Sequence, residues 1–257
     1  MNHATAGSLL GIPGVAWFWA LTVLGVGAVV ISLGRRYELL RLGRPDNRFD
    51  RIGERIRHVL VYAFGQRKMF DDPFAGVYHI LIFFGFLVVS LRTVTMVIEG
   101  LFAGWELPLL DTPAGHGYLF VKDVFERLAL VGLLGAVWRR GIERKPRVIQ
   151  SMGAWLVIGL IAILMVTDLA SEGARIAAGA VESSFLPVSS VFAALFSGLG
   201  AGALQAIYSA SWWVHLITLY VFANELPYSK HFHVYTSLFN VFFAKLDPPG
   251  RLASMDL

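Results

Sequence analysis

The feature that most constrains this chain is a series of apolar runs, each about 20 residues long. A run of that length is what an α-helix needs to cross the roughly 30 Å hydrocarbon layer of a membrane. Hydrophobic residues make up 56% of the 257 and the mean hydropathy is +0.62, which is too apolar for an ordinary soluble domain. We therefore expect an all-α, polytopic membrane protein.

The apolar runs predict a bundle of five spanning helices, at residues 15–33, 74–98, 119–138, 152–170 and 204–226. Together they make residues 1–247 a membrane domain, and residues 248–257, which begin Pro248-Pro249, a linker or tail. The first run lacks a basic segment before it and is followed by Arg35 and Arg36. It is therefore interpreted as a membrane anchor and not as a cleaved signal peptide.

The distribution of charge orients these helices. Residues 34–73 carry ten Lys and Arg against six acidic residues, so they are expected in the cytoplasm, with the N-terminus outside. Lys230 and Lys245 follow the last run and should also lie inside, which requires an odd number of crossings. The short, glycine-flanked stretch 185–199 is then an outer re-entrant or interfacial segment.

One cytoplasmic stretch, residues 51–64, has apolar side chains at helical spacing, including Ile52, Ile56 and Val59. This pattern predicts an amphipathic helix on the membrane surface or against a partner. The net charge of +4 does not indicate nucleic-acid binding, because the basic residues lie in the loops that orient the chain.

The chain contains no cysteine, so it cannot hold an iron–sulfur cluster, attach a c-type haem or form a disulfide. Histidine is its strongest available metal ligand. His79 lies near the start of an outward-running helix and His233 follows the end of an inward-running one, so both are at the inner level. We expect these two imidazoles to hold one b-type haem.

His215 lies 18 residues before His233, about 27 Å along a helix, so it cannot bind the same iron. It would serve a second haem, or it is a hydrogen-bonded core residue, which is the commoner role of a lone histidine in an apolar helix. Charged residues at the outer level form a further group, Arg92, Lys122, Glu126 and Asp168. They predict a polar pocket there. In the alternative, Arg92 extends to the membrane interface, Lys122 pairs with Glu126 and Asp123 pairs with Arg127.

Two stretches, HLITLYVFANELPYSKHFH and AGVYHILIFFGF, resemble the membrane cytochrome b of the respiratory nitrate reductase gamma-subunit type. The resemblance implies five spanning helices and two b haems, held by histidines ten residues apart on the second helix and 18 apart at the end of the fifth. His215 and His233 reproduce the second spacing and His79 matches the inner ligand, but Val89 stands where the fourth histidine is expected. His116, on the outer loop, is the candidate substitute as the partner of His215.

A closer resemblance covers most of the chain. RLGRPDNRFDRIGERI, FGQRKMFDDPFAGVYH, FLVVSLRTV and LPYSKHFHVYTSLFNVFF are similar to the membrane domain of heterodisulfide-reductase-like electron transfer flavoprotein:menaquinone oxidoreductases. The resemblance implies a protein of the bacterial inner membrane that passes electrons between a cytoplasmic iron–sulfur protein or domain and menaquinone or ubiquinone, with electron transfer flavoprotein acting indirectly. The family's cysteine-ligated domain would be a separate polypeptide, or this chain is the isolated membrane part.

Under this interpretation Arg92, Lys122, Glu126 and Asp168 become quinone-site candidates, because quinone reduction takes up protons. Two alternatives remain open. The chain could be a haem-bearing membrane anchor or docking subunit without its own quinone site, or a haem-free transporter with incidental histidines.

Overall fold

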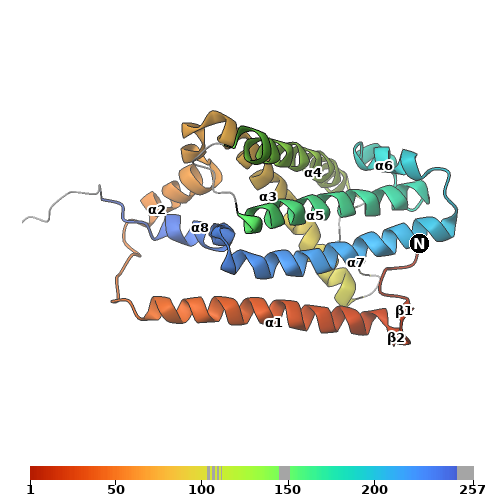
Figure 1. The fold of residues 1–257 in the computed structure, drawn as a ribbon, viewed down its shortest axis with the longest axis horizontal. Coiled ribbons are helices and arrows are strands. Elements are labelled where there is room, and N and C mark those ends of the chain that lie inside the picture. The colour runs from red at the N-terminus through yellow and green to blue at the C-terminus, as the bar shows by residue number, and fades with distance from the viewer. Residues whose placement is uncertain (103–104, 106–107, 109, 111, 145–150, 248–257) are drawn as a thin grey trace, which may run out of the picture.

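The structure is a computed structural model that describes residues 1–102, 105, 108, 110, 112–144 and 151–247. The predicted tail, residues 248–257, lies outside the described residues. The described part is all-α apart from a small antiparallel hairpin of β1 (Ser8–Leu9) and β2 (Ile12–Pro13). Its long helices are α1 (Gly14–Arg41), α3 (Pro73–Leu101), α4 (Pro113–Trp138), α5 (Met152–Ala177) and α7 (Ala201–Glu225). They form a bundle in which consecutive long helices alternate in direction (Figure 1).

Four helices are long and apolar enough to cross a membrane, namely α1, α3, α5 and α7. The all-α fold class is therefore confirmed. The fifth predicted span corresponds to α4, which at 26 residues is about 39 Å long but carries four charged residues near its middle, Lys122, Asp123, Glu126 and Arg127. Its role as a crossing helix stays a prediction.

Three of these helices begin at a side chain that caps their exposed backbone amides. Asp72 accepts a hydrogen bond from Ala75 at the start of α3, and Ser151 does the same for α5. Thr112 caps α4, with Pro113 in its first position, where proline is favoured. Helix α4 therefore begins six residues before the predicted residue 119, and His116, expected on a loop, lies in its first turn.

Small residues let α3 and α4 approach closely. A Cβ added to Gly85 would lie 2.6 Å from the Ala129 Cβ, and one added to Gly132 would lie 2.7 Å from the Tyr78 carbonyl oxygen. Close approach at small residues is a common way to pack helices in membranes. Gly85 and Gly132 therefore mark the contact between α3 and α4.

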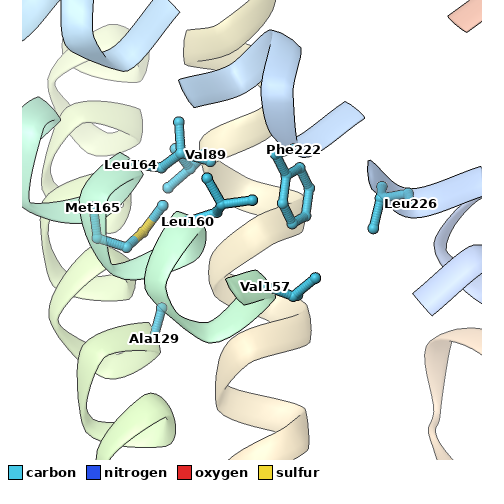
Figure 2. Packing of buried hydrophobic residues seen from close by; sticks show 8 residues of the cluster. All are labelled: Val89, Ala129, Val157, Leu160, Leu164, Met165, Phe222 and Leu226. Carbon is cyan, nitrogen blue, oxygen red and sulfur yellow. The ribbon is translucent and has the colours of Figure 1, made fainter. Parts of the chain in front are cut away.

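The core of the bundle is an apolar cluster contributed by α3, α4, α5, α7 and the first residue after α7 (Figure 2). Its members are Val89, Ala129, Val157, Leu160, Leu164, Met165, Phe222 and Leu226. Helix α1 lies outside this cluster, and hydrogen bonds join it to α7. The Tyr220 hydroxyl donates to the Thr22 hydroxyl at 2.9 Å and the Asn224 amide donates to the Gly25 carbonyl at 3.0 Å.

Short helices gather at one end of the bundle, which we call the α8 end (Figure 1). The predicted amphipathic helix 51–64 corresponds to α2 (Ile52–His58) and a π-helix, Val59–Phe64. A 3-10 helix (Arg67–Asp71), a π-helix (Arg139–Glu143) and two 3-10 turns (Leu226–Tyr228 and Lys230–Phe232) lie here too. The end also holds α8 (His233–Phe242), a helix that the sequence analysis did not predict.

The opposite end, the hairpin end, holds β1 and β2 together with a 3-10 turn (Ser183–Phe185) and α6 (Ser189–Phe196). At eight residues α6 is about 12 Å long, which is too short to cross a membrane. It packs on α5, where a Cβ on Gly173 would lie 2.5 Å from the Phe192 Cβ.

Candidate functional site

His79 and His233 lie side by side at the α8 end, although 154 positions separate them in the sequence. His79 lies in the second turn of α3 and His233 is the first residue of α8. Their ring centroids are 6.3 Å apart and their planes meet at 32°. A metal-to-imidazole bond is about 2 Å and the ring centre lies roughly 1 Å further, so two imidazoles on opposite sides of one metal have centroids about 6 Å apart.

The hydrogen bonding of the two rings also suits a ligand pair. The Nδ1 of His233 lies 3.3 Å from the Lys230 carbonyl oxygen, and because a carbonyl only accepts, this nitrogen carries the proton. The Nε2 lone pair of the neutral ring is then available, as in many metal-binding histidines. The Nδ1 of His79 is buried and has no hydrogen-bond partner within the described part of the chain, which a further group at this site would relieve. The residues present therefore fit a bis-imidazole group.

A third imidazole, His231, lies beside this pair, with its ring centroid 6.2 Å from that of His233. Burial lowers the pKa of His231 to about 4, and His233, Lys230 and Arg140 add to the effect. Within the described ranges, no group of three or more His, Cys, Asp or Glu side chains is arranged to hold a metal ion.

Helix α1 supports the turn that carries these histidines. The guanidinium of Arg36 lies 4.7 Å from the ring centre of Phe232 and 5.6 Å from that of Tyr228. The Tyr228 and Ser32 hydroxyls are 2.6 Å apart. Contacts of an arginine with aromatic faces contribute roughly 0.5–2 kcal/mol each, depending on solvation.

Arg55 of α2 anchors the end of α8 and is almost fully buried, at 3% exposure. Its guanidinium donates to the carbonyl oxygens of Phe242 at 2.8 Å and Ala244 at 3.0 Å, and pairs with Asp50 at 2.6 Å. These carbonyls have no partner within the helix, so Arg55 caps α8. Sequence reasoning missed this role, although Arg55 lies three residues after Ile52 and thus on the apolar side of the predicted helix.

His215 is buried in α7, and its Nδ1 lies 3.1 Å from the Thr167 hydroxyl of α5. It therefore has the contact expected of a hydrogen-bonded core histidine. Val89, at the position where the resemblance implies a fourth histidine, packs in the apolar core with Leu164 and Phe222 (Figure 2).

The structure brings the four quinone-site candidates together in one buried network. Lys122 of α4 lies 2.5 Å from Asp168 of α5 and 3.3 Å from Glu126. Arg92 of α3 lies 3.5 Å from Asp168 and 2.6 Å from Glu99. The predicted Lys122–Glu126 pair is confirmed, and the guanidinium of Arg92 is paired inside the bundle instead of extending to the interface.

The predicted pair of Asp123 with Arg127 is wrong. The Asp123 carboxylate accepts hydrogen bonds from the Val188 amide at 2.5 Å, the Ser189 amide at 3.0 Å and the Ser189 hydroxyl at 2.5 Å. Arg127 is exposed. Asp123 thus fixes the start of α6, because a carboxylate at unpaired amides stabilises a helix N-terminus.

Several buried polar atoms near the network lack a hydrogen-bond partner among the described residues, namely Glu126 Oε2, Ser171 Oγ and the Tyr118 hydroxyl. Buried polar groups are nearly always satisfied by protein or by ordered water. The network therefore has unused capacity to bind water or to exchange protons with a ligand.

His116 stacks on Phe185, with ring centroids 3.9 Å apart and planes 15° from parallel. Among the contacts of the described residues, none joins His116 to His215. The pairing of these two histidines on a second haem stays a prediction.

Curated proteins with similar sequences agree with the membrane-domain resemblance. The chain is 30% identical to the probable iron-sulfur-binding oxidoreductase FadF of Bacillus subtilis over 240 residues, which is 93% of this chain and 34% of FadF. It is 27% identical to EtfAB:quinone oxidoreductase of Syntrophomonas wolfei over 253 residues, 93% of this chain and 35% of that protein. It is 24% identical over 189 residues to one component of the dihydromethanophenazine:CoB--CoM heterodisulfide reductase of Methanosarcina barkeri, 71% of this chain and 64% of that component.

The chain thus spans about a third of the length of the first two of these relatives. No protein-family model and no solved structure matches it. Taken with the four apolar helices, the similarity to a component of heterodisulfide reductase identifies a multi-pass membrane protein.

Proposed function

We propose that this chain is a membrane cytochrome b that passes electrons between a cytoplasmic iron–sulfur or flavoprotein partner and the quinone pool. The observation that carries the proposal is the His79–His233 pair, whose 6.3 Å centroid spacing suits two axial ligands of one iron. The names of two relatives, an iron-sulfur-binding oxidoreductase and an EtfAB:quinone oxidoreductase, support the same reaction class.

In this proposal His79 and His233 hold one b-type haem, which supplies one-electron chemistry when bound. The Lys230 carbonyl orients the His233 ring, and Arg55 and Arg36 hold the segments on either side of it. A single haem is favoured, because Val89 is packed in the core and His215 is bonded to Thr167.

The proposed topology has five crossings in the bacterial cytoplasmic membrane, with the N-terminus and the hairpin end outside. Helix α4 is the fifth span. Its Lys122 and Glu126 are paired inside the bundle, and its Asp123 is bonded to α6, so these charges need not face lipid. Charged groups within spanning helices are normally accommodated in this way.

The buried network of Arg92, Lys122, Glu126 and Asp168 is proposed to exchange protons with a menaquinone or ubiquinone bound nearby. Glu126 Oε2 supports this role, because it has no hydrogen-bond partner among the described residues and a carboxylate oxygen of this kind can accept a proton.

At the α8 end, basic side chains offer a docking surface for an acidic iron–sulfur protein or domain. They are Arg57, Arg67, Lys68, Arg140, Arg144 and Lys230. Complementary charge would speed and orient this association.

The alternative is a haem-bearing anchor or docking subunit without its own quinone site. One observation favours it: the four network residues are buried and paired with one another, as in a purely structural cluster.

A reduced-minus-oxidised absorption spectrum of the purified, haem-supplied protein tests the proposal. We expect a b-type band that disappears in His79→Ala and in His233→Ala, because each removes one of two axial ligands. His231→Ala, two residues from His233, is the matched control and should keep the band, as should His215→Ala.

A full band in both ligand variants would refute the haem site, and a halved band in His215→Ala would show a second haem. A shift of the haem signal on adding a quinone analogue would separate the quinone-linked cytochrome from the anchor protein.

A further inference from the structure

A cavity of about 620 Å³ lies at the hairpin end, apart from both the histidine pair and the charged network. Residues 2–10 form one wall and the outer halves of α1 and α7 form the other. Ligand sites for small organic molecules usually have volumes of roughly 300–1,000 Å³. The cavity is therefore large enough for a substituted two-ring headgroup.

The walls are mainly aromatic and aliphatic. Trp17 and Leu21 come from α1, and Trp213 and Ile217 from α7, all within helices able to span a membrane. The hairpin contributes Leu9 and Leu10, whose side chains are 64% and 85% exposed. A cavity with this lining suits an apolar ring.

Hydrogen bonds hold the wall formed by the N-terminal segment in place. The side chain of Gln205 donates to the Asn2 carbonyl at 2.9 Å and accepts from the Asn2 amide at 3.0 Å. The Trp213 indole donates to the Ala4 carbonyl at 3.2 Å, and the Trp17 indole donates to the Leu9 carbonyl at 3.2 Å. The cavity is thus preformed, which lowers the entropic cost of binding.

His3 is the titratable side chain in this lining. Its Nδ1 accepts a hydrogen bond from the Thr5 amide at 3.3 Å, so the proton of the neutral ring is on Nε2. That Nε2 is buried, and no residue that the structure describes forms a hydrogen bond with it. The ring packs edge-on against Trp212, with centroids 5.3 Å apart.

His3 also connects the cavity with the charged network. Burial lowers the pKa of His3, and the positive charges of Arg92 and Arg175 lower it further. Arg92 belongs to the network that includes Asp168 and Lys122.

From this arrangement we infer that the cavity between the N-terminal segment, α1 and α7 binds the headgroup of a membrane quinone, with His3 as the hydrogen-bonding residue. The inference rests on the proposed quinone-linked function. It places the ring in a cavity separate from the four residues of the charged network, which are occupied with one another.

Photoaffinity labelling with an azido-naphthoquinone analogue of the intact protein in lipid nanodiscs tests this site. We expect cross-links on peptides from residues 2–21 and 205–217. Ile217→Trp fills the cavity and should weaken binding of the analogue by about tenfold or more, because the added ring takes the space of the ligand. Val214→Trp adds the same kind of bulk on α7 at a position outside the cavity lining and is the matched control.

Unchanged affinity in Ile217→Trp, or cross-links confined to α3 and α4, would overturn the inference while leaving the proposed function intact. If the wild-type protein shows its haem band but binds no analogue, the quinone-linked function itself fails. His3→Gln, which keeps a donor, should retain binding, whereas His3→Phe should lose it. Equal binding by these two variants would refute the role of His3.

Discussion

At the scale of single residues, buried charged groups determine how the ends of this molecule are held. Arg55 is 187 positions before Phe242, yet its guanidinium caps the helix that presents His233. A buried arginine with several carbonyl partners contributes more to stability than an exposed one, because its removal leaves those carbonyls without partners in an apolar setting.

We expect Arg55→Met to lower the free energy of unfolding of the α8 end by about 2–4 kcal/mol, as the Phe242 and Ala244 carbonyls and Asp50 lose their partner. Hydrogen exchange of the α8 amides would measure the loss. Arg57→Met, on the same helix but exposed, should change it by less than about 0.5 kcal/mol. Equal exchange in the two variants would contradict the capping role.

At the scale of helices, close contact between α3 and α4 sets the position of both His79 and Lys122. The backbones approach at Gly85 and Gly132, where any side chain would meet atoms of the facing helix. Because lipid tails are as apolar as the side chains, such packing contributes much of the stability of helix pairs in membranes.

Gly132→Ala should therefore destabilise the protein by about 1–3 kcal/mol, because its Cβ would lie 2.7 Å from the Tyr78 carbonyl oxygen. Gly159→Ala on α5 meets no atom within 4 Å and should be neutral or slightly stabilising through its higher helix propensity. Thermal unfolding of the two variants in the same detergent compares them. If Gly132→Ala unfolds at the same temperature as the wild type, α3 and α4 can move apart at this position without loss of stability.

At the scale of the whole molecule, the two ends of the bundle differ in composition. The α8 end has the histidine pair and basic side chains, and the hairpin end has the apolar cavity. If five helices cross the membrane, these ends face opposite compartments, and an electron entering at one would leave toward the other. Whether the two ends face opposite compartments therefore depends on whether α4 crosses the membrane.

Because the chain has no cysteine, single introduced cysteines report topology without background. We expect a membrane-impermeant maleimide added to intact spheroplasts to label Ser184→Cys but not Asn47→Cys or Ile142→Cys. Permeabilised cells should label all three. If α4 does not cross, Ile142→Cys would react from outside and Ser184→Cys would not.

Much of the helical architecture was predictable from local patterns in the sequence. Apolar runs located the long helices because burial in lipid requires about 20 apolar residues, and loop charges gave their expected order across the membrane. The Lys122–Glu126 pair was also predictable, since residues four apart share a helix face. His79 and His233 could be matched because depth in a membrane follows from distance along the chain.

What the sequence by itself determined, then, is the set of apolar helices and the level of each polar residue along them. Only the tertiary structure decided which residues at one level meet. Asp123 bonds Ser189 instead of Arg127, Lys122 reaches Asp168, and the first residues of the chain fold onto α7 to close a cavity. The physical reason is that these contacts join positions from 46 to 203 residues apart, and the rotation and approach of packed helices, which no local pattern encodes, choose among them.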